Sequence, residues 1–136
     1  MEQLKNILTE HDLRPSFHRI KVLEYLASHK THPTPEAIYQ DLRAAIPTIS
    51  RATVYNSLKV FVEKGLATAL HVGGEEARYD YRDAGHAHFY CVQCGNLIDI
   101  DYQCPSLSLK KIGNHQITEA QLSFRGICAR CVKERN

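Results

Sequence analysis

Apolar residues recur at helical spacing through the first half of the chain. Four stretches before residue 65 carry them three or four positions apart, which is the period of one helix face. Pro15, Thr34-Pro35 and Ser50 precede the second, third and fourth stretches, where hydroxyl N-caps and an early proline favour a helix start, and Gly65 ends the fourth. The apolar positions are Leu4, Ile7 and Leu8; Phe17, Ile20, Leu23, Leu26 and Ala27; Ile38, Leu42 and Ala45; and Val54, Leu58, Phe61 and Val62.

Two short β-like runs follow the last helix. Residues 67–72 and 77–82 predict strands, and the Gly73-Gly74 pair between them predicts a hairpin. Helices followed by a hairpin is the order of a winged helix-turn-helix, in which the helix after the turn enters the DNA major groove. Residues off the apolar face of that helix could contact phosphates and base edges. These DNA-binding candidates are Arg51, Thr53, Tyr55, Asn56 and Lys59.

Helical periodicity fades after residue 83. Short β-rich runs at 87–92, 96–102 and 116–124 predict a second, smaller α/β module, joined to the first by a short hinge near residues 82–85. The predicted fold class is therefore α+β. On pattern alone, a helix-turn-helix module that binds a protein partner instead of DNA remains open.

Length and composition narrow the class of protein. With 136 residues, 43% hydrophobic and 24% charged, the chain has room for one domain or two small modules and not for a large multidomain enzyme. The longest apolar run, 89–92, is far too short for a membrane span, and no apolar segment near the start resembles a secretion signal. We therefore expect no membrane association and a cytoplasmic location.

Charge adds only a weak argument for nucleic acid. The net charge is +2, but residues 14–64 hold eight Lys and Arg against four acidic residues. This basic bias suits a DNA-binding surface, and a solvated helical surface would explain it equally well.

All five cysteines lie after residue 90, and four of them form two C-x2-C pairs. Cys91 with Cys94 and Cys128 with Cys131 could each direct two thiolates at one ion, and four sulfurs make a closed tetrahedral zinc site. An odd number of cysteines and no secretion signal argue against a disulfide framework. Two pairs of buried or redox-active thiols are the alternative. Cys104 lies outside both pairs, and we do not expect it to be a ligand.

A second set of candidate ligands contains no sulfur. His86 and His88, two apart on an extended strand, point to the same face, and Asp99 follows on the next strand with Asp101 on its face. Asp80 near the end of the hairpin, and His32, expected to be extended before Pro33, could join them. Histidine with carboxylate suits Fe(II), Mn(II) or Zn(II), and the oxygen donors favour iron and manganese.

Five motifs stand in the order, and nearly the spacing, typical of the ferric uptake regulator family. They are His32-Pro-Thr, Ala52-Thr-Val-Tyr-Asn, Arg78-Tyr-Asp80, His86-x-His88-x2-Cys91-x2-Cys94-Gly and Cys128-x2-Cys131. The chain resembles this family over almost its whole length. Within the family, Asp at position 99 is similar to the peroxide-sensing branch, whereas iron sensors usually carry Glu there.

The resemblance implies a homodimeric repressor with a structural zinc ion and a regulatory ion. Residues 1–83 would form the winged-helix DNA-binding domain, and residues 84–136 the dimerisation and metal-binding domain. The partner would be double-stranded DNA with a palindromic operator. By motif position, Cys91, Cys94, Cys128 and Cys131 match the zinc ligands, and His32, Asp80, His86, His88 and Asp99 match the ligands of the regulatory Fe(II) or Mn(II).

These ligands lead to a hypothesis for the signal. With Fe(II) bound, peroxide would oxidise His32 or His86 and end the repression of oxidative-stress genes, whereas Mn(II) would leave the repressor active. No small-molecule substrate other than peroxide is expected. An iron- or zinc-responsive uptake repressor with reversible metal binding is the first alternative. A hydrolytic or oxygen-activating metalloenzyme is the second, less favoured because the sequence shows no substrate cleft.

Overall fold

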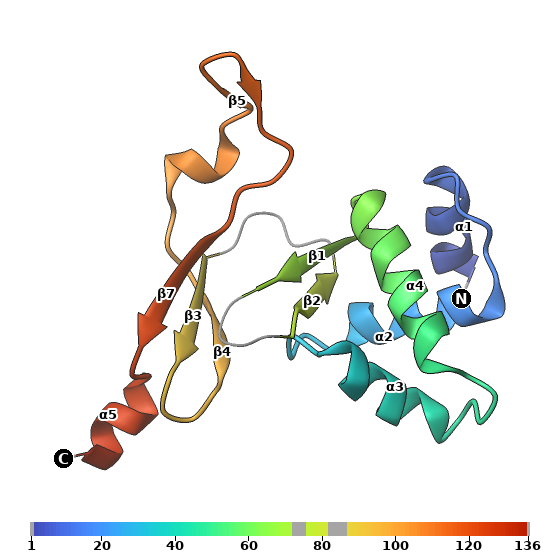
Figure 1. Ribbon diagram of the computed structural model, residues 1–136, viewed down its shortest axis with the longest axis horizontal. Coiled ribbons are helices and arrows are strands. Elements are labelled where there is room, and N and C mark those ends of the chain that lie inside the picture. Colours follow the sequence, from blue (N-terminus) through green and yellow to red (C-terminus); the bar gives the residue numbers. More distant parts are fainter. Residues whose placement is uncertain (1, 72–75, 82–86, 136) are drawn as a thin grey trace. The chain divides into compact units, whose positions relative to one another are not determined.

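The computed structural model describes residues 2–71, 76–81 and 87–135, and these fall into two compact units (Figure 1). The N-terminal unit comprises residues 2–71 and 76–81, and the C-terminal unit comprises residues 87–135. The predicted hinge near 82–85 and the predicted Gly73-Gly74 turn lie outside the described residues.

Four helices form most of the N-terminal unit: α1 (Glu2–Glu10), α2 (Phe17–Ser28), α3 (Pro35–Arg43) and α4 (Arg51–Glu63). The side chains of Thr34 and Ser50 accept hydrogen bonds from Ala37 N and Thr53 N, both at 3.1 Å, as the cap positions predicted. Gly65, with φ of +76°, follows α4 in the left-handed conformation that glycine adopts most easily.

The apolar faces of these helices meet in one aliphatic core. Val54, Leu58 and Phe61 of α4 have no exposed surface, and they belong to a cluster with Leu23 of α2 and Ile38 of α3. Strands β1 (Ala67–Leu70) and β2 (Arg78–Tyr81) then pair antiparallel, with Thr68 opposite Asp80. The predicted α+β class and the N-terminal winged helix-turn-helix are therefore confirmed.

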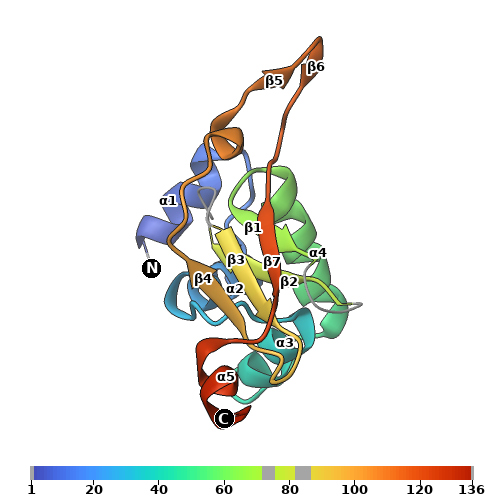
Figure 2. The ribbon, with the colours of Figure 1, turned by 90° about the vertical axis from the view of Figure 1, so that its left-hand side faces the viewer.

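The C-terminal unit is built on a three-stranded sheet of order β4-β3-β7 (Figure 2). Strand β3 (Ala87–Cys91) pairs antiparallel with β4 (Leu97–Ile100) and parallel with β7 (Leu122–Gly126). Between β4 and β7 come the 3-10 helix η1 (Pro105–Ser108) and a small hairpin of β5 (Lys111–Ile112) and β6 (His115–Gln116). A final helix, α5 (Ala129–Arg135), completes the unit.

Several local predictions are wrong. The strand predicted at 116–124 is divided, because the β5–β6 hairpin ends at Gln116 and β7 begins only at Leu122. Helix α5 was not predicted, since its seven residues show no helical period of apolar positions. Phe17, assigned to an apolar face, is 53% exposed at the first residue of α2.

Among the described helices, none has the length and apolar character needed to cross a bilayer.

Candidate metal sites and nucleic-acid surface

The four cysteines of the two C-x2-C pairs converge in the C-terminal unit. Cys91 ends β3, Cys94 lies in the turn after it, Cys128 precedes α5 and Cys131 lies on α5. The four sulfurs lie within 4.8 Å of one another, and the Sγ atoms of Cys91 and Cys131, like those of Cys94 and Cys128, are 3.8 Å apart.

That spacing fits a zinc tetrahedron and not a disulfide. Zn–S bonds of about 2.3 Å place the sulfurs of a tetrahedron about 3.8 Å apart, whereas a disulfide needs about 2.05 Å. All five cysteines are free thiols, and Cys104 lies outside the cluster, as expected. The donor set therefore fits a structural zinc ion, which Cys91, Cys94, Cys128 and Cys131 would hold.

Backbone amides already prepare one of these sulfurs for negative charge. The N–H groups of Cys128 and Cys94 donate to Cys91 Sγ at 3.3 and 3.4 Å, and these bonds lower the pKa of the Cys91 thiol. Burial raises the pKa of the Cys131 thiol, and the hydrogen bonds between this thiol and its neighbouring thiols add to the effect. Four thiolates so close together would repel one another, and a bound divalent cation would offset this repulsion.

The N-terminal unit carries one pair of the predicted regulatory ligands. His32 Nδ1 lies 2.6 Å from Asp80 Oδ1, and both side chains are largely shielded from solvent. A backbone bond from Tyr79 N to Pro33 O, at 3.0 Å, holds β2 beside the loop that carries His32. The expectation that His32 is extended is wrong, because its φ is +54°. Left-handed backbone at a residue other than glycine costs about 1–3 kcal/mol and is found preferentially at functional sites.

The C-terminal unit carries a second pair. His88 on β3 and Asp99 on β4 are directly opposed in the antiparallel register, and His88 Nε2 lies 3.3 Å from Asp99 Oδ1. The His88 side chain is buried and that of Asp99 is half exposed. Asp101 lies beyond the end of β4 and is exposed. His86, the fifth predicted ligand, lies outside the described residues.

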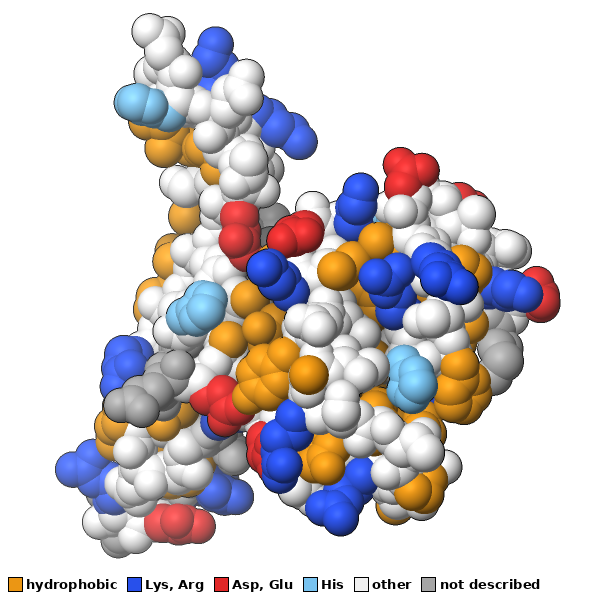
Figure 3. Space-filling view, turned by 45° about the vertical axis from the view of Figure 1, so that its right-hand side comes forward, with side chains coloured by type: hydrophobic (Ala, Val, Ile, Leu, Met, Phe, Trp, Pro, Cys, Tyr) orange, Lys and Arg blue, Asp and Glu red, His pale blue; other side chains and the backbone are white. Residues whose placement is uncertain are grey.

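The predicted DNA-contact residues lie on the outer side of α4. Arg51, Tyr55, Asn56 and Lys59 are exposed and Thr53 is half-buried, whereas the apolar face of the same helix is in the core. Lys and Arg side chains recur over the visible face of the N-terminal unit (Figure 3). On the outer side of α4 itself, Arg51, Asn56 and Lys59 supply the polarity and charge that a groove-binding helix needs.

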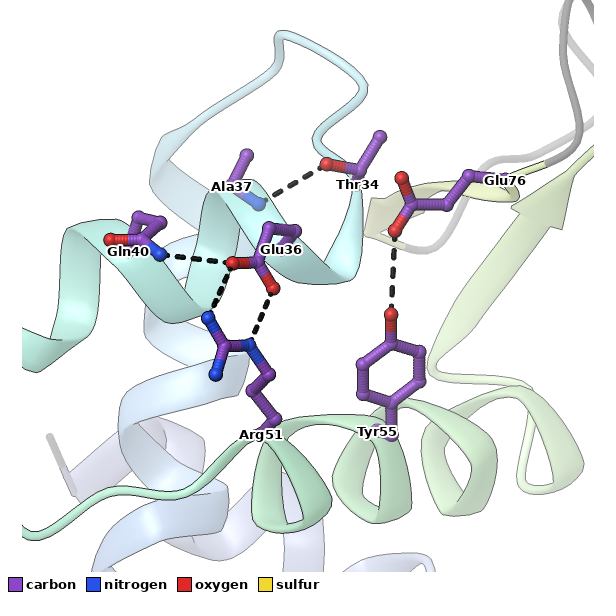
Figure 4. Close-up of polar contacts among 7 residues, drawn as sticks. All are labelled: Thr34, Glu36, Ala37, Gln40, Arg51, Tyr55 and Glu76. Carbon is purple, nitrogen blue, oxygen red and sulfur yellow. Dashed lines mark hydrogen bonds and ion pairs between the residues drawn. The ribbon is translucent and has the colours of Figure 1, made fainter.

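Two of these residues have acidic partners that the sequence patterns did not indicate. Arg51 is paired with Glu36 of α3, and the Tyr55 hydroxyl donates to Glu76 Oε1 at 3.4 Å (Figure 4). The partners are 15 and 21 positions away along the chain. No local spacing relates residues so far apart, so only the packing of α3 and of the hairpin against α4 brings them together.

Comparison with known proteins gives a consistent result. The family model described as "Ferric uptake regulator family" matches residues 10–125. A curated relative, the peroxide-responsive repressor PerR of Staphylococcus aureus (strain Mu50 / ATCC 700699), is 35% identical over 129 residues, covering 91% of this chain and 86% of the relative.

Solved structures agree with the observed fold. The ferric uptake regulator of Pseudomonas aeruginosa with manganese aligns with a TM-score of 0.73 at 26% identity, over 92% of this chain and 97% of that chain. The peroxide stress regulator of Campylobacter jejuni aligns with a TM-score of 0.68 at 26% identity, over 96% of this chain and 97% of that chain.

Proposed function

The chain belongs to the ferric uptake regulator family, and we propose from this premise that it is a metal-responsive repressor that senses peroxide through iron-catalysed oxidation of a histidine ligand. The observation that carries the proposal is that each unit contributes one His–Asp pair, His32 with Asp80 and His88 with Asp99. The likeness to the S. aureus peroxide-responsive repressor, at 35% identity, supports the peroxide signal.

We propose that the two pairs, together with His86, hold one regulatory ion. Three imidazoles and two carboxylates are a ligand set that Fe(II) and Mn(II) accept. An ion shared by the two units would favour one arrangement of the DNA-binding unit only as far as it binds that arrangement more tightly. A full switch needs about 5.5 kcal/mol of such difference. Ligands contributed by both units are suited to supply it.

The remaining parts of the proposal concern DNA. The outer side of α4, with Arg51, Thr53, Tyr55, Asn56 and Lys59, would contact the major groove, and two copies of the chain would bind a palindromic operator as a homodimer. The protein would act in the cytoplasm on oxidative-stress genes, without enzymatic turnover.

The chemistry expected of ferrous iron is reduction of peroxide beside the imidazole ligands. In the net reaction a ring C–H of a ligand histidine would become C–OH with one peroxide oxygen, and the other oxygen would leave as water. His32 and His86 are the proposed targets. An oxidised ring is a poor ligand, so the two units would lose their shared ion and DNA would be released.

The test compares two metals and two kinds of recovery. The Fe(II) protein should lose its operator in a gel shift after brief peroxide treatment, and mass spectrometry should find one added oxygen atom on a peptide containing His32 or His86. The Mn(II) protein should keep the operator under the same treatment. Unmodified peptides, with DNA binding restored simply by adding metal, would instead support a reversible iron- or zinc-responsive uptake repressor.

A further inference from the structure

The guanidinium of Arg51 is held in place by the carboxylate of Glu36. Arg51 Nε donates to Glu36 Oε2, and Arg51 Nη2 donates to Glu36 Oε1, both at 2.9 Å (Figure 4). Gln40 Nε2 also donates to Glu36 Oε1 at 2.9 Å, one turn further along α3. The acceptor is therefore fixed by its own helix, and a two-point pair with it restricts both the position and the rotation of the guanidinium.

A second contact fixes the plane of the same group. The Cζ atom of Arg51 lies 4.4 Å from the centre of the Tyr39 ring, within the range of a cation–π contact. Hydrogen bonds from Arg51 and Gln40 lower the pKa of Glu36 to about 2, so the carboxylate stays ionised throughout the neutral range. Glu36 thus restrains one edge of the Arg51 guanidinium and Tyr39 one of its faces, although the Arg51 side chain is 57% exposed.

The geometry of the pair leaves one edge of the guanidinium available for another partner. Five N–H groups surround the guanidinium, and Glu36 takes the side edge formed by Nε and Nη2. The end edge, formed by Nη1 and the second N–H of Nη2, is a parallel pair of donors. Such a fork matches the O6 and N7 acceptors that guanine presents in the major groove.

The other acidic contact on this surface is much looser. Tyr55 is joined to Glu76 by one hydrogen bond of 3.4 Å between exposed side chains, against the two bonds of 2.9 Å at Arg51. Arg51 is therefore the candidate DNA-contact side chain that the described structure restrains most completely. It also lies at the first residue of α4, and the N-terminal residues of a recognition helix are those that reach base edges.

We infer that Glu36 is a positioning residue, which holds Arg51 ready to read a guanine in the operator. The inference rests on the proposed DNA-binding function. Because the fork is ordered before DNA arrives, binding does not have to order a long, flexible side chain. That advantage applies only where a base offers two acceptors at the right place, so it increases the preference for the operator over other DNA.

The test measures preference between DNA sequences, which a purely structural residue would not change in a position-specific way. Wild-type protein loaded with Mn(II) first selects its operator from random-sequence duplexes. Dissociation constants are then measured at fixed salt for that operator, for the operator with each G·C pair replaced by A·T, and for a random duplex. Glu36→Gln is compared with Glu63→Gln, which removes the same charge from the far end of α4.

Glu36→Gln should weaken operator binding about two- to tenfold, the range expected for ordering one long side chain. Binding of the random duplex should stay the same or tighten, since a negative charge is lost near DNA. Glu63→Gln should keep the wild-type ratio of operator to random binding. Arg51→Ala should remove the preference at one G·C pair, and Glu36→Gln should have no further effect in that background.

Other outcomes would overturn the inference. If Glu36→Gln tightens binding to operator and random duplex alike, Glu36 competes with DNA for Arg51. If it weakens both equally, Arg51 contacts phosphate and not guanine. Thermal melts of each variant identify any loss of folding. Failure of the wild-type protein to select any duplex would contradict the proposed DNA-binding function itself, and is thereby distinguished from failure of this inference.

Discussion

Removing zinc from the four-cysteine cluster should unfold the C-terminal unit and leave the N-terminal unit folded. Within residues 87–135, the buried hydrophobic cluster consists of Cys91, Cys128 and Cys131, with Phe89, Cys94 and Ile127 packed against it. Apart from these cysteines, Ala87 and Leu97 are the buried apolar residues described in this unit. We therefore expect its folding to depend on a metal ion held by the four thiolates.

The sizes of the competing terms support this expectation. Complete burial of a leucine contributes about 1.5–3 kcal/mol, and ordering the backbone of a single residue costs about 1–2 kcal/mol. Binding of structural zinc contributes about 10–16 kcal/mol in small zinc domains at neutral pH, more than this unit's few buried apolar side chains can supply. The N-terminal unit has a cluster of fifteen buried residues and needs no metal for its core.

The assay is a two-dimensional NMR spectrum of ¹⁵N-labelled protein before and after chelation under reducing conditions, with zinc measured by mass spectrometry. Signals from residues 87–135 should collapse toward unfolded positions, and those from residues 2–71 should remain dispersed. Cys128→Ser should reproduce the collapse without chelator, whereas Cys104→Ser should keep one zinc ion per chain. A dispersed C-terminal spectrum after complete loss of zinc would refute the reasoning.

Three further predictions concern the N-terminal unit. Ser50→Ala removes the oxygen that accepts from Thr53 N and should lower the free energy of unfolding by about 1 kcal/mol, measured by urea titration. An unchanged urea midpoint would show that the Ser50 cap does not stabilise α4. Leu58→Ala empties a fully buried site and should cost about 2–5 kcal/mol in the same assay, so a loss below 1 kcal/mol would show that the core closes around the gap. Carboxyl NMR should give Glu36 a pKa of about 2, below its ordinary 4.5. Its pairing with Arg51 should therefore stabilise the fold fully above pH 4.5, and this stabilisation should be lost as the pH falls through about 2. A titration midpoint near 4.5 would show that the pair does not persist in solution.

The sequence by itself determined the four N-terminal helices, the caps at Thr34 and Ser50 and the chemistry of the cysteine pairs. Helical spacing, a hydroxyl before each of α3 and α4, and two C-x2-C motifs are local properties that act over a few residues, so they can be read without knowing the fold. The same reasoning failed where local signals are weak, as at α5 and the divided 116–124 segment. There, the structure is decided by the pairing of β7 with β3 and by the clustering of Cys128 and Cys131 with Cys91 and Cys94.

The motifs placed His32 and Asp80 in one candidate site, but only the tertiary structure decided how these and other distant side chains meet. His32 reaches Asp80 because β2 is bonded to the loop after α2, with a left-handed backbone at His32 that no pattern predicted. Arg51 meets Glu36 because α3 packs against α4. The physical reason is that a contact between residues far apart in the chain depends on how whole elements pack together. Residue spacing along the chain carries no information about that packing.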